Sequence, residues 1–472
     1  MTTNDNIVAA IDIGTTKIVT IVGRLNDNKK LEVLGLSRQD STGVKRGVVQ
    51  NIDETVASIA QTIDEVEKQS GLKMSEVFVG IAGQHIRSIK NRGYINRNSV
   101  NDEITRADIA NLINDMYKIP IEIGEEIIHV IPQSFIVDNE PGIKNPVGML
   151  GRRLEANFHI VIGQVTSAKN SEKCVNRCGL DVKSLMLEPL ASAAAVLTPD
   201  EIEAGVALVD IGGGTTDLAV YYDDVLRHTA VIPFGGNVIT KDIKEGCAIL
   251  QRQAELLKVQ YGSALGDLAP ADKVVSIPGI AGREPKEISF SNLAYIIQSR
   301  MEEILDAVCF EIENSGYMDK LSAGIVVTGG GALLRHLPQL VKFKTGMDVR
   351  IGYPNEHLSI DAYSDINHPM YSTAIGLILK GYEHYAEKNE KPAGAIHPDA
   401  GNAKEVIFDQ PKIEVPKAAD EIVIEKPMHN FETIVEQNTE QKPLLTKSKP
   451  SIFASIKRTF NDIFEEDESV KM

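Results

Sequence analysis

The chain has 472 residues, of which 43% are hydrophobic and 24% are charged, and its formal net charge is −17. This length exceeds what one hydrophobic core supports, so we expect roughly two to four lobes. The acidic balance argues against general nucleic-acid binding, which needs basic surface to neutralise phosphates. No stretch approaches about 18 uninterrupted apolar residues, and the N-terminus lacks the basic and apolar regions of a secretory signal. We therefore expect neither a membrane-spanning helix nor a secretory signal.

Residues 7–25, IVAAIDIGTTKIVTIVGRL, predict the first hairpin of the chain. Two apolar runs rich in β-branched residues flank a short turn, a pattern typical of paired buried strands. Glycine lets the main chain approach a ligand closely, and successive N–H groups beside threonine hydroxyls form a concave anion site. The turn matches neither GxxxxGK[ST] nor GxGxxG, so a P-loop or a Rossmann crossover fits poorly. The candidate phosphate-binding residues of this turn are Gly14, Thr15, Thr16 and Lys17.

The next part of the chain alternates helical and strand signals, which is typical of an α/β protein. Apolar residues at helical spacing predict a helix that starts near Ile52 and stops at Gly71. A strand, EVFVGIAG, follows it. Residues 85–163 differ, because extended segments surround one helix that begins near Thr105. We expect this region to be a small α+β insertion.

Residues 209–217, VDIGGGTTD, repeat the residue pattern of the first hairpin. Both copies read Asp-Ile-Gly, then a turn of glycine and threonine, then a second apolar run. Two unrelated glycine turns would explain either copy alone, but the shared residues favour a duplicated domain with one phosphate clamp in each half. The candidate phosphate-binding residues of the second turn are Gly212, Gly213, Gly214, Thr215 and Thr216.

Asp12 and Asp210 end the strands that precede the two turns. If they face each other across a nucleotide, their carboxylates suit Mg²⁺ held through water, because Mg²⁺ prefers oxygen ligands and dehydrates reluctantly. The alternative is that each aspartate only orders its own turn by bonding the backbone. The matched positions favour the metal role, and both residues are also catalytic candidates.

Glu188 ends a predicted strand, DVKSLMLE, and precedes an alanine-rich helix. Its carboxylate would either interact with the helix dipole or orient an attacking water at the floor of a phosphate cleft. The sequence leaves both interpretations open, and Glu188 is the third catalytic candidate.

Two further groups are candidates for binding the rest of a nucleotide. A third glycine turn, in AGIVVTGGGALL, suits a flat ring lying against bare backbone; its residues are Gly329, Gly330 and Gly331. Glu255 and Lys258 lie on one face of a predicted helix. They would bond ribose hydroxyls or, alternatively, form a surface ion pair with each other.

Composition changes after Tyr385, where the chain becomes rich in Lys, Glu, Pro, Ala and Asn. Such a stretch buries too little apolar surface to offset its ordering entropy, which predicts a disordered linker. One patterned segment follows, SIFASIKRTFNDIF, whose large apolar residues share one helical face beside basic residues. We expect it to lie in a membrane surface, the alternative being a helix docked on protein. The residues expected to contact the membrane are Ile452, Phe453, Ile456, Lys457, Arg458, Phe460, Ile463 and Phe464.

The hairpins, the alanine-rich helix between them and VVTGGGALL resemble the motifs of the actin-like ATPase superfamily, which includes actin, heat-shock chaperone ATPases and sugar kinases. Within it, three stretches resemble the FtsA family of bacterial cell-division proteins: IPQSFIVDNEPGIKNPVGMLGRRLEANFHIV, EPLASAAAVLTPDE and LRHTAVIPFGGNVITKDI. The resemblance covers residue 7 to about residue 383, together with the final amphipathic segment.

The resemblance implies an α/β, actin-like two-lobed ATPase fold of duplicated ribonuclease-H-like domains, with ATP and Mg²⁺ between the lobes. It also implies an inserted α+β subdomain, placed differently from that of actin, a disordered linker and a C-terminal amphipathic helix. The longer linker and the acidic EEDE after the last helix depart from shorter family members and leave reach and membrane affinity open.

The implied function is a scaffold with at most slow ATP hydrolysis. Such a protein forms filaments on the cytoplasmic side of the anionic cell membrane at the division site, anchors the FtsZ ring there and recruits later division proteins. The C-terminal tail of the tubulin-like protein FtsZ is the implied partner of the helical subdomain, and Arg300 matches a contact position. A metabolic kinase would not need the tether, and a chaperone would need a folded peptide-binding domain where residues 386–472 are too polar for one.

The expected divisions of the chain follow from these assignments. The first lobe is expected to comprise residues 6–84, 164–198 and 362–385, and the inserted subdomain used in self-assembly residues 85–163. The second lobe is expected to comprise residues 199–239 and 309–361, with residues 240–308 as its helical subdomain that binds the FtsZ tail. Residues 386–446 form the expected linker and residues 449–466 the expected membrane-targeting helix.

Overall fold

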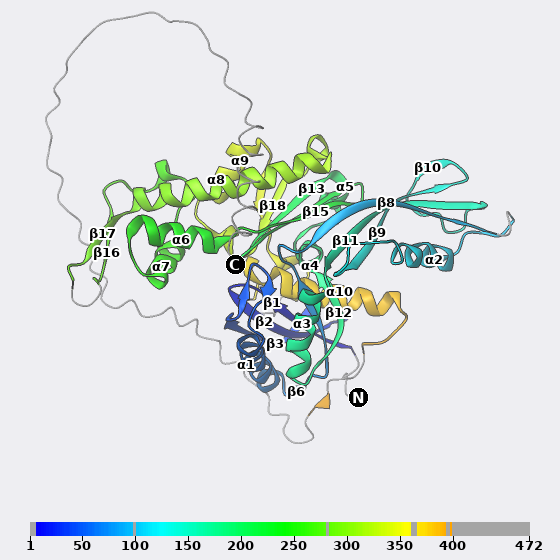
Figure 1. Ribbon diagram of the computed structural model, residues 1–472, viewed down its shortest axis with the longest axis horizontal. Coiled ribbons are helices and arrows are strands. Elements are labelled where there is room, and N and C mark those ends of the chain that lie inside the picture. Colours follow the sequence, from blue (N-terminus) through cyan, green and yellow to red (C-terminus); the bar gives the residue numbers. More distant parts are fainter. Residues whose placement is uncertain (1–5, 98–100, 280–282, 360–365, 393–396, 399–472) are drawn as a thin grey trace, which may run out of the picture. The chain divides into compact units, whose positions relative to one another are not determined.

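The structure is a computed structural model that describes residues 6–97, 101–279, 283–359, 366–392 and 397–398 (Figure 1). The chain divides into two units, Met1–Ile424 and Glu425–Met472, and every described residue belongs to the first unit. The expected membrane helix, with its eight candidate membrane residues, and residues 399–446 of the expected linker lie outside the described residues.

A five-stranded mixed sheet forms the centre of the first lobe, in the order β12-β7-β1-β2-β3. β2 pairs antiparallel with β1 and β3, whereas β7 pairs parallel with β1 and β12. Every residue of β1 is buried, as the apolar run before Asp12 predicts for a central strand. The strands are β1 (Ile7–Ile13), β2 (Lys17–Leu25), β3 (Leu31–Asp40), β7 (Glu76–Ile81) and β12 (Asp181–Leu187).

A second sheet repeats this topology in the order β15-β14-β13-β18-β19. β14 pairs antiparallel with β13 and β15, and β18 pairs parallel with β13 and β19. The strands are β13 (Val206–Ile211), β14 (Thr216–Tyr222), β15 (Val225–Ile232), β18 (Ile325–Thr328) and β19 (Val349–Ile351). Two sheets with the same order and strand directions are what a duplicated domain produces.

Helices cover both faces of the first sheet and join the two lobes (Figure 1). α1 and α3 pack on one face of the first sheet and α10 and α4 on the other, while α8 and α9 cover one face of the second sheet. One buried cluster joins α4 and α10 to strands of both sheets, so α4 lies between the lobes. The helices are α1 (Ile52–Ser70), α3 (Val165–Arg177), α4 (Glu188–Val196), α5 (Pro199–Ala204), α8 (Phe290–Ser315), α9 (Leu337–Thr345) and α10 (Ser372–Glu387).

Local sequence explains where α1 begins and ends. The Asn51 side chain caps it by accepting a hydrogen bond from the Glu54 N–H at 3.3 Å. Gly71 ends it in the left-handed conformation, with φ of 68°. Ile59, Ile63 and Val66 are buried against the sheet, which confirms the helix predicted from their spacing.

The inserted region forms a four-stranded antiparallel sheet of order β10-β9-β11-β8, with α2 on one face (cyan in Figure 1). α2 starts with a capping box between Thr105 and Asp108, at the place where the sequence predicts a helix start. The elements are β8 (Arg87–Asn96), α2 (Arg106–Met116), β9 (Glu125–Val137), β10 (Glu140–Ile143) and β11 (Arg153–Gln164).

The inserted sheet makes hydrogen bonds to both lobes. The Ser88 hydroxyl donates to the Thr229 carbonyl of β15 at 3.2 Å, and His159 Nε2 lies 2.8 Å from Thr229 Oγ1. On the other side, the backbone N–H of Leu187 in β12 donates to His129 Nε2 at 3.0 Å. The insertion is therefore fixed to one strand of each lobe.

Helices and a small hairpin project from the second lobe between β15 and β18 (green in Figure 1). α8 continues to Ser315, past the boundary expected at residue 308, because its last turns bury apolar residues in the core of the second lobe. The other elements here are α6 (Gly236–Cys247), α7 (Gln251–Tyr261), β16 (Val274–Ile277) and β17 (Lys286–Ser289).

The remaining described elements are short. They are β4 (Val44–Lys45), β5 (Val48–Val49), β6 (Leu72–Lys73), β20 (His397–Pro398) and the 3₁₀ helices η1 (Gly266–Leu268), η3 (Met318–Lys320), η4 (Gly330–Leu333), η5 (Pro354–Glu356) and η6 (Pro369–Tyr371). Two features bear on the expected linker: α10 extends two residues into it, and β20 within it pairs with β6.

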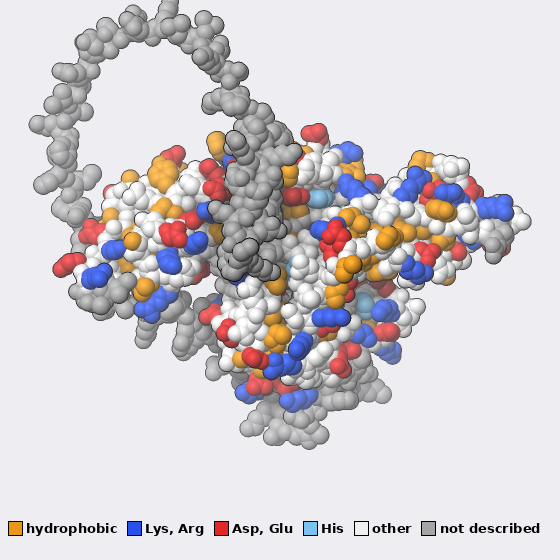
Figure 2. Space-filling view, viewed as in Figure 1, with side chains coloured by type: hydrophobic (Ala, Val, Ile, Leu, Met, Phe, Trp, Pro, Cys, Tyr) orange, Lys and Arg blue, Asp and Glu red, His pale blue; other side chains and the backbone are white. Residues whose placement is uncertain are grey.

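Among the described residues, no helix combines the length and apolar character needed to cross a bilayer. On the face shown in Figure 2, acidic and basic side chains are interspersed over the described surface. The net charge of −17 therefore does not gather into one acidic field on that face.

Candidate functional site

The two hairpins place their turns at equivalent positions. In the first lobe Ile13 pairs with Ile18, and in the second lobe Ile211 pairs with Thr216, so four residues form the loop in each hairpin. Asp12 and Asp210 occupy the same register position one residue earlier. The repeated Asp-Ile-Gly motif thus corresponds to the same backbone geometry in both hairpins.

The two turns contact each other directly. A Cβ atom at Gly213 would lie 1.7 Å from Thr16 Oγ1, and one at Gly214 would lie 2.4 Å from Thr15 Oγ1. Threonine side chains of the first turn therefore occupy the space that any side chain on the second turn would need. Glycine is required here for close approach.

Four carboxylates line the cavity at this contact, together with Lys17. Asp12, Asp210 and Asp217 are buried, with exposed fractions of 5%, 8% and 4%. Glu188 begins α4 at the end of β12, and Gly80 leaves room for its side chain. Asp217 was not among the candidate residues, although its place seven residues after Asp210 and its pairing with that residue across the hairpin follow from the same motif.

Hydroxyl groups hold two of these carboxylates. Asp210 accepts hydrogen bonds from Ser192 at 2.6 Å and from Thr373 at 3.3 Å. Asp217 accepts one from Thr215 at 3.2 Å, while its second oxygen has no partner among the described protein atoms. Ser192 and Thr373 carry no motif that sequence reasoning would detect, because only folding brings α4 and α10 to this point.

Burial disfavours the charged form of all four carboxylates. It raises the pKa of Asp12 to about 6, and the charge of Asp210 adds to this effect while Lys17 opposes it. Burial also raises the pKa of Glu188 well above its usual range, helped by Asp12, Asp217 and Asp210. The pKa values of Asp210 and Asp217 are raised for the same main reason. The cavity therefore holds four carboxyl groups whose ionised forms Lys17 alone cannot balance.

This excess of buried carboxylate fits a hard divalent cation. Within the described part of the chain, no three His, Cys, Asp or Glu side chains converge as a metal-binding group. A cation at this place would accordingly keep several water ligands, as Mg²⁺ does. Asp12 and Asp210 fit such a site, because they occupy equivalent positions near the ends of β1 and β13 at the same cavity.

The third glycine turn adjoins the second hairpin. Gly329 has φ of 82°, and a Cβ atom there would lie 2.2 Å from Asp210 Oδ1. Gly329 and Gly330 line the cavity with Met370, whereas Gly331 packs on Ile211. The cavity measures about 50 Å³, which is below the range typical of ligand sites, about 300–1,000 Å³.

Glu255 and Lys258 lie beside the second turn and do not line this cavity. Lys258 Nζ is 2.8 Å from the Glu255 carboxylate, which is the ion pair that the sequence allowed as an alternative. Lys258 also donates to the Gly236 carbonyl at 3.0 Å, and the Gly236 N–H donates to the Gly212 carbonyl at 2.9 Å. Gly236 therefore links the Glu255–Lys258 pair to the second glycine–threonine turn.

Arg300 lies on α8, away from the hairpins. Its guanidinium forms ion pairs with Asp242 at 2.6 Å and with Glu303 at 2.5 Å. On the preceding turns of α8, Asn292 and Tyr295 line a separate cavity of about 690 Å³ in the helical subdomain.

The duplicated sheets, the helix between them and the glycine–threonine turns that meet at buried aspartates define an actin-like ATPase fold. A solved structure of the PilM–PilN type IV pilus biogenesis complex shares it, with a TM-score of 0.57 at 15% sequence identity, covering 79% of this chain and 98% of that one. This likeness shows the fold alone.

Sequence comparison identifies the family. The family model "Cell division protein FtsA" matches residues 207–376, and "SHS2 domain inserted in FTSA" matches residues 83–162. The cell division protein FtsA of Pseudomonas aeruginosa is 40% identical over 382 residues, which span 80% of this chain and 90% of that protein. The Escherichia coli protein of the same name is 36% identical over 390 residues, or 81% and 92% of the two chains. The chain belongs to the FtsA family of cell division proteins.

Proposed function

We propose that this protein binds Mg-ATP, assembles on the cytoplasmic face of the cell membrane and anchors the FtsZ ring there while recruiting later division proteins. The observation that carries the proposal is the pair of equivalent hairpins, whose turns meet at four carboxylates and one lysine. The family assignment supports the role in division.

In this proposal, backbone N–H groups and hydroxyls of the two turns bind the phosphates, together with Lys17. Asp12 and Asp210 hold Mg²⁺ through water, and Mg²⁺ neutralises charge on the phosphates. The turn at Gly329–331 faces the base, and the pair of Glu255 and Lys258 faces the ribose. Because the closed cavity measures only about 50 Å³, the two turns must separate when the nucleotide enters.

Glu188 is the group that we assign to orienting water at the γ-phosphate. It begins α4 directly after β12 and lines the same cavity as Asp12, and the raised pKa that burial gives it makes its carboxylate a better proton acceptor. Hydrolysis is slow in this proposal, since the protein works as a scaffold whose nucleotide state sets its assembly.

In this proposal, two separate surfaces make the contacts with other proteins: one with further copies of this chain and one with FtsZ. Self-association uses the inserted subdomain, whose described residues include five exposed large apolar side chains: Tyr94, Tyr117, Ile123, Val147 and Leu150. The acidic FtsZ tail binds the helical subdomain near Arg300. Since Asp242 and Glu303 already neutralise that guanidinium, the tail binds by displacing at least one of them.

Membrane attachment rests on the sequence of residues 449–466, which lie outside the described residues. Six large apolar side chains on one helical face give reversible binding, and neighbouring lysines and arginine attract anionic headgroups. Changing both Phe453 and Phe460 to Glu should therefore abolish co-sedimentation of the full-length protein with anionic vesicles. In the same assay, FtsZ should pellet with vesicles only when the unaltered protein is present.

The matched control changes Phe408 and Phe431 to Glu, which adds the same charge within the linker. This control should sediment with vesicles as the unaltered protein does, and calorimetry should give all three proteins the same affinity for Mg-ATP. Sedimentation of the Phe453 and Phe460 variant with the vesicles would show that the anchor lies elsewhere.

A further inference from the structure

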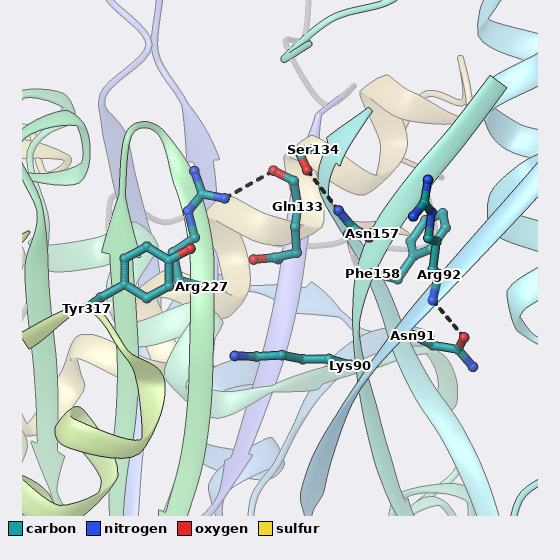
Figure 3. Close-up of a pocket in the computed structure, with 9 residues that line it drawn as sticks. All are labelled: Lys90, Asn91, Arg92, Gln133, Ser134, Asn157, Phe158, Arg227 and Tyr317. Atoms are coloured by element: carbon teal, nitrogen blue, oxygen red, sulfur yellow. Dashed lines mark hydrogen bonds between the residues drawn. The ribbon is translucent and has the colours of Figure 1, made fainter. Parts of the chain in front are cut away.

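A second cavity lies where the inserted sheet meets the second lobe. β8 is an edge strand of the inserted sheet and β15 an edge strand of the second-lobe sheet, and the two approach each other at Ser88 and Thr229. Next to this contact, β8, β9, β11 and β15 surround a cavity of about 480 Å³, closed on one side by Tyr317 (Figure 3). This volume falls within the range typical of ligand sites, about 300–1,000 Å³.

The cavity is cationic although the protein is acidic. Lys90, Arg92 and Arg227 line it, and none of its described lining residues is Asp or Glu. Arg92 is paired with Glu155 at 2.6 Å, and Arg227 donates to the backbone carbonyls of Tyr222 and Gln133 at 3.0 and 3.2 Å. These contacts hold both guanidinium groups in place as part of the cavity wall.

Lys90 is different, because it is exposed and forms no ion pair with any residue that the structure describes. Figure 3 shows its side chain extending from β8 across the cavity toward the side where Arg227 and Tyr317 lie. An ammonium group that points into a cavity without a carboxylate partner favours an anionic ligand.

The neutral lining indicates which kind of anion. Ser134, Asn91 and Asn157 offer hydroxyl and amide groups, which can donate or accept hydrogen bonds. A peptide backbone presents both donors and acceptors, whereas a phosphate chain presents acceptors only.

We propose that this cavity binds an acidic peptide segment of a partner protein, with a carboxylate of that segment on Lys90. Its walls come from the inserted sheet and from the second lobe, so the bound segment contacts both. The site is separate from the hairpin cavity and from the helical-subdomain cavity, with which it shares no lining residue.

The test uses a fluorescein-labelled hexaglutamate peptide and the full-length protein. Lys90→Glu should weaken binding at least tenfold in fluorescence anisotropy, because it replaces the attracting charge by a repelling one. The matched control is Lys118→Glu, which makes the same charge change at an exposed lysine of the same subdomain, where Asp115 is its partner at 2.8 Å. This control should bind the peptide with unchanged affinity.

Two further measurements locate the site and its ligand class. A zero-length carbodiimide should couple the probe to Lys90, which peptide mapping by mass spectrometry detects. A labelled hexathymidylate should bind at least tenfold more weakly than the peptide. The proposal is overturned if hexaglutamate does not bind, if Lys90→Glu binds it as tightly as the unaltered protein, if Arg300→Ala abolishes binding instead, or if the oligonucleotide binds equally well.

Discussion

The two glycine–threonine hairpins share loop length and strand register, yet each carries a charged side chain where the other has a neutral one. Lys17 in the first loop corresponds to Thr215 in the second, and Asp217 in the second hairpin corresponds to Val19 in the first. Duplication thus preserved what the backbone needs while the side chains diverged. One half supplies the cation of the cavity and the other an additional carboxylate, so neither turn alone would make the site.

The strand ends beside the hairpins differ in the same way, and here we expect the largest effect. Glu188 follows β12 in the first lobe, whereas Gly352 follows the equivalent β19 in the second. Glu188→Gln removes a carboxylate that takes up a proton but keeps the shape of the side chain. It should slow ATP hydrolysis, measured as phosphate release, by about 100-fold or more.

Calorimetry should give Glu188→Gln the Mg-ATP affinity of the unaltered protein, which separates loss of chemistry from loss of binding. Release of phosphate at the original rate would mean that Glu188 acts only on the dipole of α4.

The second prediction concerns the aspartate of the first hairpin. The pKa of Asp12 is about 6 in the folded protein against a usual 3.8, so the folded state binds this proton more tightly than the unfolded state. That contribution to stability is present below pH 3.8 and is lost as the pH rises through 6. For nucleotide-free protein at pH 8, Asp12→Asn should therefore raise the free energy of unfolding by about 3 kcal/mol.

Urea unfolding at several pH values measures this difference, which should shrink as the pH falls toward 4. Asp27→Asn, at an exposed position of the same lobe, is the control and should unfold like the unaltered protein at every pH. Saturating Mg-ATP should stabilise the unaltered protein more than Asp12→Asn. An Asp12→Asn variant less stable than the unaltered protein at pH 8 without nucleotide would contradict the electrostatic account.

The smallest effect tests the contact between the two turns. Gly213→Ala places a methyl group on Thr16 Oγ1 and should lower the free energy of unfolding by about 1–3 kcal/mol through overpacking. Gly330→Ala is the matched control, because no atom lies within 4 Å of the added Cβ atom. Equal unfolding midpoints for the two variants would show that the turns do not meet in the nucleotide-free protein.

Local patterns in the sequence predicted much of the fold. Apolar periodicity and Gly71 predicted α1, Thr105 predicted the start of α2, and the repeated Asp-Ile-Gly motif predicted the duplication. The actin-like fold and the family suggested by these motifs are confirmed. Such features depend on residues close together in the chain, where spacing alone carries the information.

The remainder depends on contacts between distant segments. Ser192 and Thr373 reach Asp210 only after α4 and α10 pack between the sheets, and Thr16 meets Gly213 only because the two hairpins face each other. The partners of Arg300 include Asp242 from α6, 58 residues earlier in the chain. No periodicity or turn chemistry encodes these pairings.

α8 is a long helix that connects the helical-subdomain cavity to the sheet of the second lobe. Its 26 residues span about 39 Å, at about 1.5 Å of rise per residue. Its first turns border the helical-subdomain cavity, and its later turns pack against β14, the strand that begins with Thr216 and Asp217. A tilt of about 5° about one end of a rod this long displaces the other end by about 3 Å. If a ligand at the cavity tilts α8, the part of α8 that packs on the second-lobe sheet moves with it, and by reciprocity a shift of that sheet would alter affinity at the cavity.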